Sequence, residues 1–165
     1  YEMLRSLVGS EMCIRDSVTG ARISFLVGRR DVVAAFKKLR GQIDFGMFLP
    51  VQKAAIAALT GPLDMVKTQC GLYQQRRDAL CGGLRSIGWN VPDSHGSMFV
   101  WAPIPEKYAK SMDFCLDLVE KSGVLCTPGS SFGPLGEGYV RFALTLPPER
   151  IADAVKSIKV SGILD

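Results

Sequence analysis

Apolar residues recur along the chain at spacings that predict an alternation of short strands and helices. Residues 23–27 form an apolar run that ends at a glycine, which is typical of a buried strand. Residues 31–40 begin with the potential capping carboxylate of Asp31 and place apolar side chains on one face, so they predict a helix. Residues 51–59 resume the helical spacing, and a longer helix, polar enough to lie at a surface or between domains, is expected at 63–84.

After Gly88 the spacing changes to short apolar runs, and strands are expected at residues 89–91 and 97–102. A helix follows, with Ser111 placed to cap its N-terminus and Gly123 placed to end it. The apolar stripe expected on this helix consists of Met112, Cys115, Leu118 and Val119. These elements begin a small α+β unit.

Residues 124–144 contain two apolar runs joined by a glycine-rich loop, and we expect a strand on each side of that loop. A final helix is expected to begin at the prolines of residues 147–148. Arg141 lies in the second apolar run. A guanidinium stays charged at ordinary pH and is costly to bury without a partner. Arg141 should therefore face an anion, either a bound carboxylate or phosphate, or a protein carboxylate such as Glu137 or Glu149.

Composition and charge narrow the classes of function. The chain has 165 residues, 47% hydrophobic and 22% charged, which is ordinary for a globular protein with a core. The net charge of +4 is spread along the sequence, so neither nucleic acid nor an acidic membrane is an expected partner. The five cysteines include no Cys-x-x-Cys pair, which favours a reducing, cytoplasmic compartment. No apolar run approaches the roughly 18 residues that span a bilayer, and no signal peptide is evident.

Few other residues indicate chemistry. His95 is the one histidine of the sequence, so neither a catalytic triad nor a histidine-rich metal site is expected. We interpret it as a solvated turn residue, with a substrate contact as the alternative. The loop at 129–138 could present backbone N–H groups to a phosphate, but it lacks the Gly-Lys-Ser/Thr ending of a P-loop. Turns that require glycine are the preferred explanation. Arg22, just before the first strand, is a second candidate anion ligand.

The first 17 residues differ from the rest of the chain. The segment Gly-Ser-Glu-Met-Cys-Ile-Arg-Asp-Ser at 9–17 resembles translated sequencing-adapter read-through. We therefore expect residues 1–17 to be an artefact that carries no information about the fold, and the start at Tyr1 indicates an incomplete sequence. The alternative is a short genuine helix. There is no internal repeat.

Five ordered segments together carry a family resemblance. They are Thr19-Gly20-Ala21-Arg22-Ile23, the apolar segment at 44–52, Met98-Phe99-Val100-Trp101-Ala102-Pro103, the segment at 127–133, and Tyr139-Val140-Arg141. Together they resemble the class I/II, fold-type I aminotransferases that use pyridoxal phosphate, especially the bacterial alanine and LL-diaminopimelate aminotransferase branch. The resemblance implies an α/β fold, namely the C-terminal part of the fold-type I transferase fold with a small α+β domain. It implies that residues 18–50 end the large cofactor-binding domain, 51–87 are interdomain connector helices, and 88–165 form the small domain.

The resemblance also implies roles for individual residues. Arg22 would bind the phosphate of the cofactor, and Arg141 would bind the α-carboxylate of the substrate, both of which suit a bidentate guanidinium. In the family, a lysine eight positions before the phosphate arginine holds the cofactor as a Schiff base and moves a proton. That position is Ile14, inside the suspected artefact, so the chain alone is expected to be inactive. Ala21 replaces the family's usual tryptophan.

The implied reaction is transfer of an amino group between an alanine-like or diaminopimelate-like amino acid and a 2-oxo acid, with pyridoxal 5'-phosphate as cofactor and no metal. The apolar loop at 45–49 is expected to form a homodimer interface. Three alternatives remain. They are the aminotransferase-like sensor domain of a transcription regulator, a lyase or decarboxylase of the same fold, and an unrelated α+β ligand-binding module in which Arg22 and Arg141 share no cleft.

Overall fold

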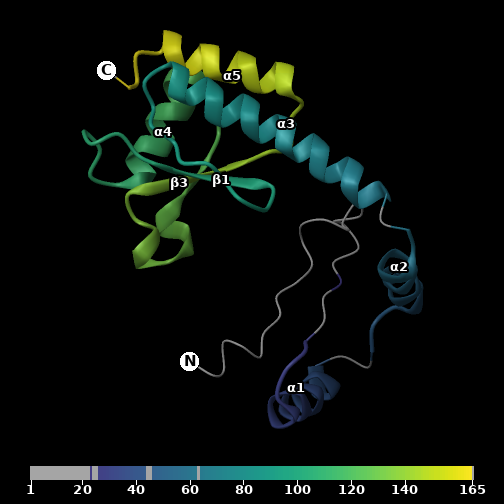
Figure 1. The fold of residues 1–165 in the computed structure, drawn as a ribbon. Helices are drawn as coiled ribbons and strands as arrows, with labels where there is room; N and C mark the ends of the chain where they lie inside the picture. Colours follow the sequence, from purple (N-terminus) through teal and green to yellow (C-terminus); the bar gives the residue numbers. More distant parts are fainter. Residues whose placement is uncertain (1–22, 24–25, 44–45, 63, 165) are drawn as a thin grey trace. The chain divides into compact units, whose positions relative to one another are not determined.

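The structure is a computed structural model that describes residues 23, 26–43, 46–62 and 64–164 (Figure 1). Residues 1–17, which include Ile14, and the predicted phosphate ligand Arg22 lie outside the described residues. The chain divides into two units, one up to Thr68 and one from Gln69 onward, and each is described by itself. None of the helices in the described part of the chain has an apolar stretch of the length that spans a bilayer. The same residues contain no group of three or more His, Cys, Asp or Glu that could hold a metal ion.

The first unit contains the helices α1 (Arg30–Ile43) and α2 (Leu49–Thr60) and the start of α3. α1 begins beside Asp31, whose carboxylate accepts hydrogen bonds from Arg29. α2 begins with Pro50 in its first turn, where the missing N–H of proline costs no helical hydrogen bond. No residue of α1 or α2 is buried, so these two helices contribute nothing to a core within this unit.

The buried strand predicted at residues 23–27 is not found at the described positions of that run. Ile23, Leu26 and Val27 belong to no strand, and Val27 is 54% exposed. A strand needs the backbone groups of a neighbouring strand to pair with its own. Every described strand of this chain lies in the second unit, so this run has no described partner in its own unit.

The second unit is built on a three-stranded antiparallel sheet in the order β1-β3-β2. Figure 1 labels its two longer strands, β1 and β3. The strands are β1 (Phe99–Pro103), β2 (Thr127–Pro128) and β3 (Tyr139–Ala143). The helices that pack with them are the later part of α3 (Asp64–Ser86), α4 (Ser111–Ser122) and α5 (Pro148–Val160). The predicted strands on the two sides of the glycine-rich loop are therefore confirmed, with the first of them only two residues long. The loop itself consists of two 3₁₀ turns, Gly129–Phe132 and Pro134–Gly136.

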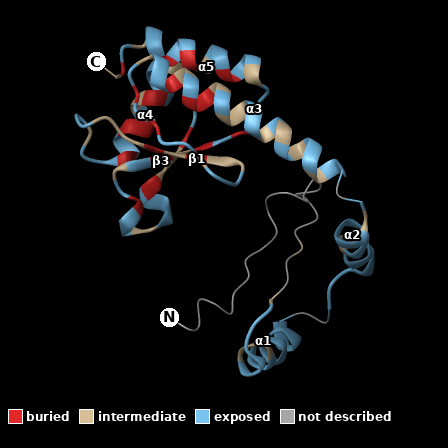
Figure 2. Cartoon of the chain, in the orientation of Figure 1, coloured by how far each residue is buried: buried red, intermediate tan, exposed pale blue. Residues whose placement is uncertain are grey.

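Burial alternates along both of the longer strands (Figure 2). Val100 and Ala102 in β1, and Val140 and Phe142 in β3, are buried, whereas the residues between them are not. Because successive side chains of a strand point to opposite faces, one face of the sheet meets the helices and the other does not. The helix residues buried in the same core are Leu80, Cys81, Leu84, Phe114, Cys115, Leu118, Ile151, Val155 and Ile158.

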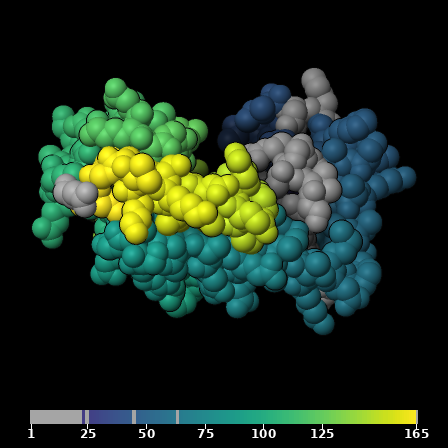
Figure 3. Space-filling model, turned by 90° about the horizontal axis from the view of Figure 1, so that it is seen from above, coloured from purple at the N-terminus to yellow at the C-terminus, as the bar shows by residue number. Residues whose placement is uncertain are grey.

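α3 is not the surface helix that the sequence predicts along its whole length. Its last turns are part of the core, because Leu80, Cys81 and Leu84 are buried. α5 lies alongside this end of α3 (Figures 1 and 3). A Cβ on Gly83 would lie only 2.9 Å from Val155 Cγ2, so the glycine allows the two helices to approach closely. The many polar residues in the middle of this helix led to the prediction of a surface helix, because they outnumber the few apolar residues at its C-terminal end.

α4 begins at Ser111, but Ser111 does not cap it. The N-cap residue is Lys110, which makes no side-chain capping hydrogen bond. The backbone N–H of Ser111 instead donates to Glu137 Oε1 at 2.6 Å, so a carboxylate from the glycine-rich loop satisfies the start of the helix. The end of the helix is as predicted, since Gly123 adopts the left-handed conformation with φ 71°.

Two further details of packing differ from the predictions. The buried side of α4 includes Phe114 and not Met112 or Val119, which are 47% and 40% exposed. Residues 89–91 form no strand, although both apolar residues of this run are buried. Trp89 instead packs in the core and donates its indole N–H to the carbonyl oxygen of Pro103 at 2.7 Å. Burial alone, without a neighbouring strand, does not make a strand.

Candidate functional site

Arg141 lies in the middle of β3, on the face of the sheet that the core helices do not cover. Its neighbours in the chain, Val140 and Phe142, are buried in the core, so the side chain between them points to the opposite face. Arg141 is paired with Trp101 of β1 on one side and with Thr127 of β2 on the other. The single arginine singled out from the sequence therefore occupies the central strand of the open sheet face.

Aromatic rings surround the guanidinium of Arg141. Its Cζ lies over the rings of Phe99 and Phe132, at 4.1 Å and 4.4 Å from their centroids. Trp101 contacts Phe132 edge-on at 5.6 Å between centroids, and it stacks on Tyr139 at 5.9 Å. A cation over an aromatic face is stabilised by roughly 0.5–2 kcal/mol, depending on how far water is excluded. The guanidinium thus contacts two rings, and Trp101 lies next to one of them.

The Nε atom of Arg141 is buried and has no hydrogen-bond acceptor, the sole such side-chain atom in the described part of the chain. Glu137, one of the two carboxylates considered from the sequence, accepts instead from the backbone N–H groups of Ser111 and Gly138. These N–H groups hold the pKa of Glu137 below its usual value. No ion pair among the described residues includes Arg141 or Glu149. The described residues thus supply no anion for this arginine.

The glycine-rich loop is closed by its own hydrogen bonds. Five of its backbone N–H groups donate within the protein, namely those of Ser130, Gly133, Gly136, Glu137 and Gly138. Gly129 and Gly136 pass so close that a Cβ on either would overlap the carbonyl oxygen of the other. Gly133 and Gly138 have φ of 113° and 84°, values that favour glycine. These conformations and close approaches support the preferred explanation, turns that require glycine, and the five N–H groups named above already donate within the protein.

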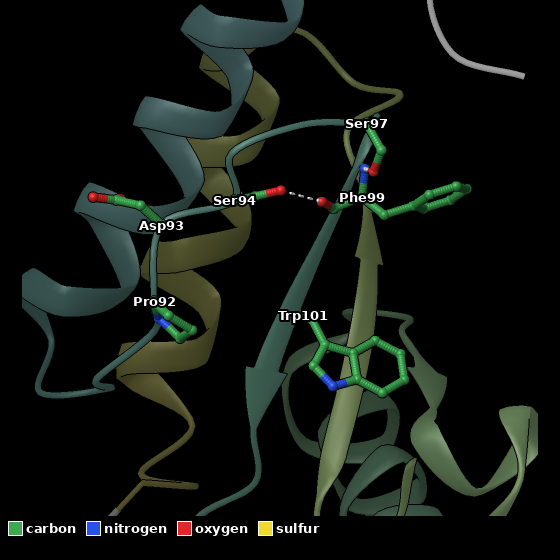
Figure 4. A pocket seen from close by; sticks show the side chains of 6 residues that line it. All are labelled: Pro92, Asp93, Ser94, Ser97, Phe99 and Trp101. Carbon is green, nitrogen blue, oxygen red and sulfur yellow. Dashed lines mark hydrogen bonds between the residues drawn. The ribbon is translucent and has the colours of Figure 1, made fainter. Parts of the chain in front are cut away.

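A hollow of about 350 Å³ adjoins Phe99 and Trp101, and Figure 4 shows the side chains that line it. It is lined by Pro92, Asp93, Ser94, Ser97, Phe99 and Trp101. Ser94 Oγ donates to the carbonyl oxygen of Phe99 at 2.9 Å, and the backbone N–H of Phe99 donates to Ser97 Oγ at 3.1 Å. Asp93 is paired with Arg85 at 2.6 Å, which lowers the pKa of its carboxyl. The hydroxyl groups of this hollow therefore fix the backbone at the start of β1.

The structure places only one of the two predicted anion ligands. Arg141 is described, whereas Arg22 lies outside the described residues, so a cleft shared by the two arginines stays a prediction. His95 is exposed, as expected of a solvated turn residue. Sequence reasoning missed the two rings that contact Arg141. For Phe99 the sequence did contain a signal, because the alternation in 97–102 puts it on the face opposite the buried Val100. For Phe132 no neighbouring residue in the sequence indicates that its ring reaches the same site.

Comparisons with known proteins agree over most of the chain. Residues 17–158 match the family model described as aminotransferase class I and II. Over 147 residues the chain is 44% identical to the LL-diaminopimelate aminotransferase of Halothermothrix orenii, covering 89% of this chain and 38% of that protein. Over 145 residues it is 41% identical to the glutamate-pyruvate aminotransferase AlaC of Escherichia coli, covering 87% of this chain and 35% of that protein.

The fold comparison gives the same result. The solved structure of an aminotransferase from Staphylococcus aureus matches with a TM-score of 0.82 and 30% identity, covering 92% of this chain and 40% of that one. The chain therefore spans less than half the length of each of these relatives.

Proposed function

The chain belongs to the class I and II aminotransferases, and on that premise we propose that it is the C-terminal segment of an enzyme that transfers an amino group between an amino acid and a 2-oxo acid. Its fold is part of the fold-type I aminotransferase fold, as the sequence predicted. Within such an enzyme, residues 18–50 would end the large domain, 51–87 would connect the domains, and 88–165 would form the small domain. The packing of the last turns of α3 into the core would tie this connector firmly to the small domain.

One observation supports the proposed role of Arg141 as the ligand of the substrate carboxylate. Its Nε is buried without an acceptor, on the open face of the sheet. A buried donor without an acceptor costs roughly 1–3 kcal/mol, and a bound carboxylate would remove that cost. Amino acids and 2-oxo acids share an α-carboxylate, whose two oxygens match the two parallel N–H groups of a guanidinium. One arginine would therefore serve both substrates and fix the position of their reacting carbon.

We propose Arg22 as the ligand of the cofactor phosphate. The family uses pyridoxal 5'-phosphate, and a guanidinium suits a phosphate for the same geometric reason that it suits a carboxylate. When bound, the cofactor supplies an electron sink for the carbon that loses its proton. No described residue is assigned to take that proton, because the family position for the lysine is Ile14. We propose that the chain alone is inactive for this reason.

The relatives named above narrow the substrates that we propose. Their names point to an alanine-like or a diaminopimelate-like amino donor. We further propose a homodimer, because Met47, Phe48 and Leu49 are 37%, 72% and 58% exposed. Phe45, the first apolar residue of the predicted interface loop, lies outside the described residues. A cytoplasmic location is proposed because the four described cysteines, Cys70, Cys81, Cys115 and Cys126, are free thiols.

The reaction is tested in the full-length enzyme that carries this segment. We expect it to convert L-alanine or LL-diaminopimelate, together with 2-oxoglutarate, into the corresponding oxo product and glutamate. The 165-residue chain should do neither and should show no visible absorption from a lysine-bound cofactor. Release of ammonia or carbon dioxide without formation of glutamate would contradict the proposal and favour a lyase or decarboxylase of the same fold.

A further inference from the structure

The guanidinium of Arg141 contacts two rings that come from different parts of the chain. Phe99 is the first residue of β1, and Phe132 is the last residue of the 3₁₀ turn Gly129–Phe132. The Cζ of Arg141 lies 4.1 Å from the first ring centroid and 4.4 Å from the second. The Phe132 residue is 51% exposed and does not belong to the core, so filling the core does not account for its ring. We call Phe99 and Phe132 the aromatic pair.

The ring of Phe132 is held by contacts that do not involve Arg141. Its centroid lies 5.6 Å from that of Trp101, in an edge-on arrangement. The turn that carries it is tied to the start of α4, where Ser111 Oγ donates to Ser130 Oγ at 3.2 Å and accepts from the Ser130 N–H at 3.4 Å. The close approach of Gly129 and Gly136 fixes the same turn from the other side. None of these contacts depends on a bound ligand.

Phe99 is fixed in a comparable way. Its N–H donates to Ser97 Oγ at 3.1 Å, and its carbonyl oxygen accepts from Ser94 Oγ at 2.9 Å. Phe99 also pairs with Ala143 across the strands, two residues beyond Arg141. Both rings are thus attached to rigid backbone, one on the sheet and one on the closed loop.

We propose that the aromatic pair consists of positioning residues, which hold the guanidinium of Arg141 in the orientation that binds a substrate carboxylate. This inference rests on the proposed role of Arg141. The N–H donors of a guanidinium lie in its own plane, so a carboxylate that binds two of them must approach along that plane, and contact with two rings limits how the plane of Arg141 can turn. That approach is the one that forms two parallel hydrogen bonds. Because the arginine has already lost much of its rotational freedom, binding of the carboxylate costs less entropy.

The test compares side chains with and without a ring in the full-length enzyme that carries this segment. In Phe132→Leu and in Phe99→Leu we expect KM for both substrates to rise roughly three- to thirty-fold, with kcat little changed. The inhibition constant of propionate, a carboxylate without an amino group, should rise by the same factor. Phe132→Tyr keeps the ring and should keep the parental values. Leu135→Ala, at a side chain of the same loop that is 99% exposed, is the matched control and should change neither constant.

The outcomes separate this inference from the function on which it rests. If Arg141→Gln raises KM and the propionate constant while Phe132→Leu and Phe99→Leu leave both at parental values, the aromatic pair is not a positioning device. If Arg141→Gln also leaves them unchanged, the proposed role of Arg141 itself fails. A Phe132→Leu enzyme that has a lower melting temperature but parental constants for propionate would show a purely structural role and would overturn the inference.

Discussion

Gly129 is the position at which one added methyl group tests the packing of the loop most directly. A Cβ on Gly129 would overlap the carbonyl oxygen of Gly136 and would lie 2.7 Å from the carbonyl oxygen of Tyr139. Both oxygens belong to the backbone, so neither moves as easily as the end of a flexible side chain. We expect Gly129→Ala to lower the free energy of unfolding by about 1–3 kcal/mol, the range found for overpacked sites.

Gly82 provides the matched control for this substitution. It lies inside α3, and a Cβ at this position would meet no atom within 4 Å. A glycine in a helix interior lowers the free energy of unfolding by roughly 0.5–1 kcal/mol relative to an alanine, chiefly because its backbone loses more conformational entropy on folding. Gly82→Ala should therefore stabilise the chain by about that amount. The same chemical change is thus expected to have opposite signs at the two positions.

Equilibrium unfolding in urea, followed by the fluorescence of the buried Trp89, measures both effects. With a slope of about 1–3 kcal/mol per molar urea, Gly129→Ala should lower the midpoint by roughly 1 M, and Gly82→Ala should raise it by a few tenths. A Gly129→Ala midpoint equal to or above that of the parent chain would refute the close approach of Gly129 and Gly136.

Three further predictions follow from the core and its thiols. Leu118→Ala, at a fully buried position, should lower the free energy of unfolding by about 2–5 kcal/mol. Leu116→Ala, at a residue 63% exposed on the same helix, should change it by less than about 0.5 kcal/mol. Equal losses of unfolding free energy in urea titrations of the two variants would contradict the placement of α4. Burial raises the pKa of Cys115 and of Cys126, so iodoacetamide should label the exposed Cys70 well before either of them, as mass spectrometry of the folded chain would show. Because burial raises their pKa in the folded chain, the same two thiols ionise more readily in the unfolded chain. The free energy of unfolding should therefore be unaffected by them at neutral pH and should fall above about pH 9. A urea midpoint that rises above pH 9 would contradict this pH dependence.

Some elements are found where local patterns of spacing and turn residues predict them, although the strand among them also depends on pairing with a distant strand. The helix ended by Gly123 and the strand that carries Arg141 are found where the spacing predicts them. The features that the sequence did not reveal depend on residues far apart in the chain. Glu137 caps a helix 26 positions away, and this separation hid both the true cap of α4 and the fact that this carboxylate is not the partner of Arg141.

At residues 23–27 the sequence predicts an element that the structure does not contain at the described positions. Their apolar composition predicts a buried strand, but a strand also needs hydrogen-bonding neighbours, which the described part of the chain does not provide in that unit.

Only part of the candidate site could be predicted from the sequence. The charge of Arg141 in an apolar strand was evident, whereas the contact with Phe132 depends on how a closed loop folds back over the sheet.

The measurement that tests the central claim most directly is the effect of Arg141→Gln on both substrates of the full-length enzyme that carries this segment. If Arg141 binds the α-carboxylate, the variant loses charge-assisted hydrogen bonds worth about 1.5–3 kcal/mol, so kcat/KM should fall roughly ten- to two-hundred-fold for the amino acid and for the 2-oxo acid alike. The propionate inhibition constant should rise in parallel, while the melting temperature should stay near that of the parent. Parental kcat/KM values for both substrates in a folded Arg141→Gln enzyme would contradict the account.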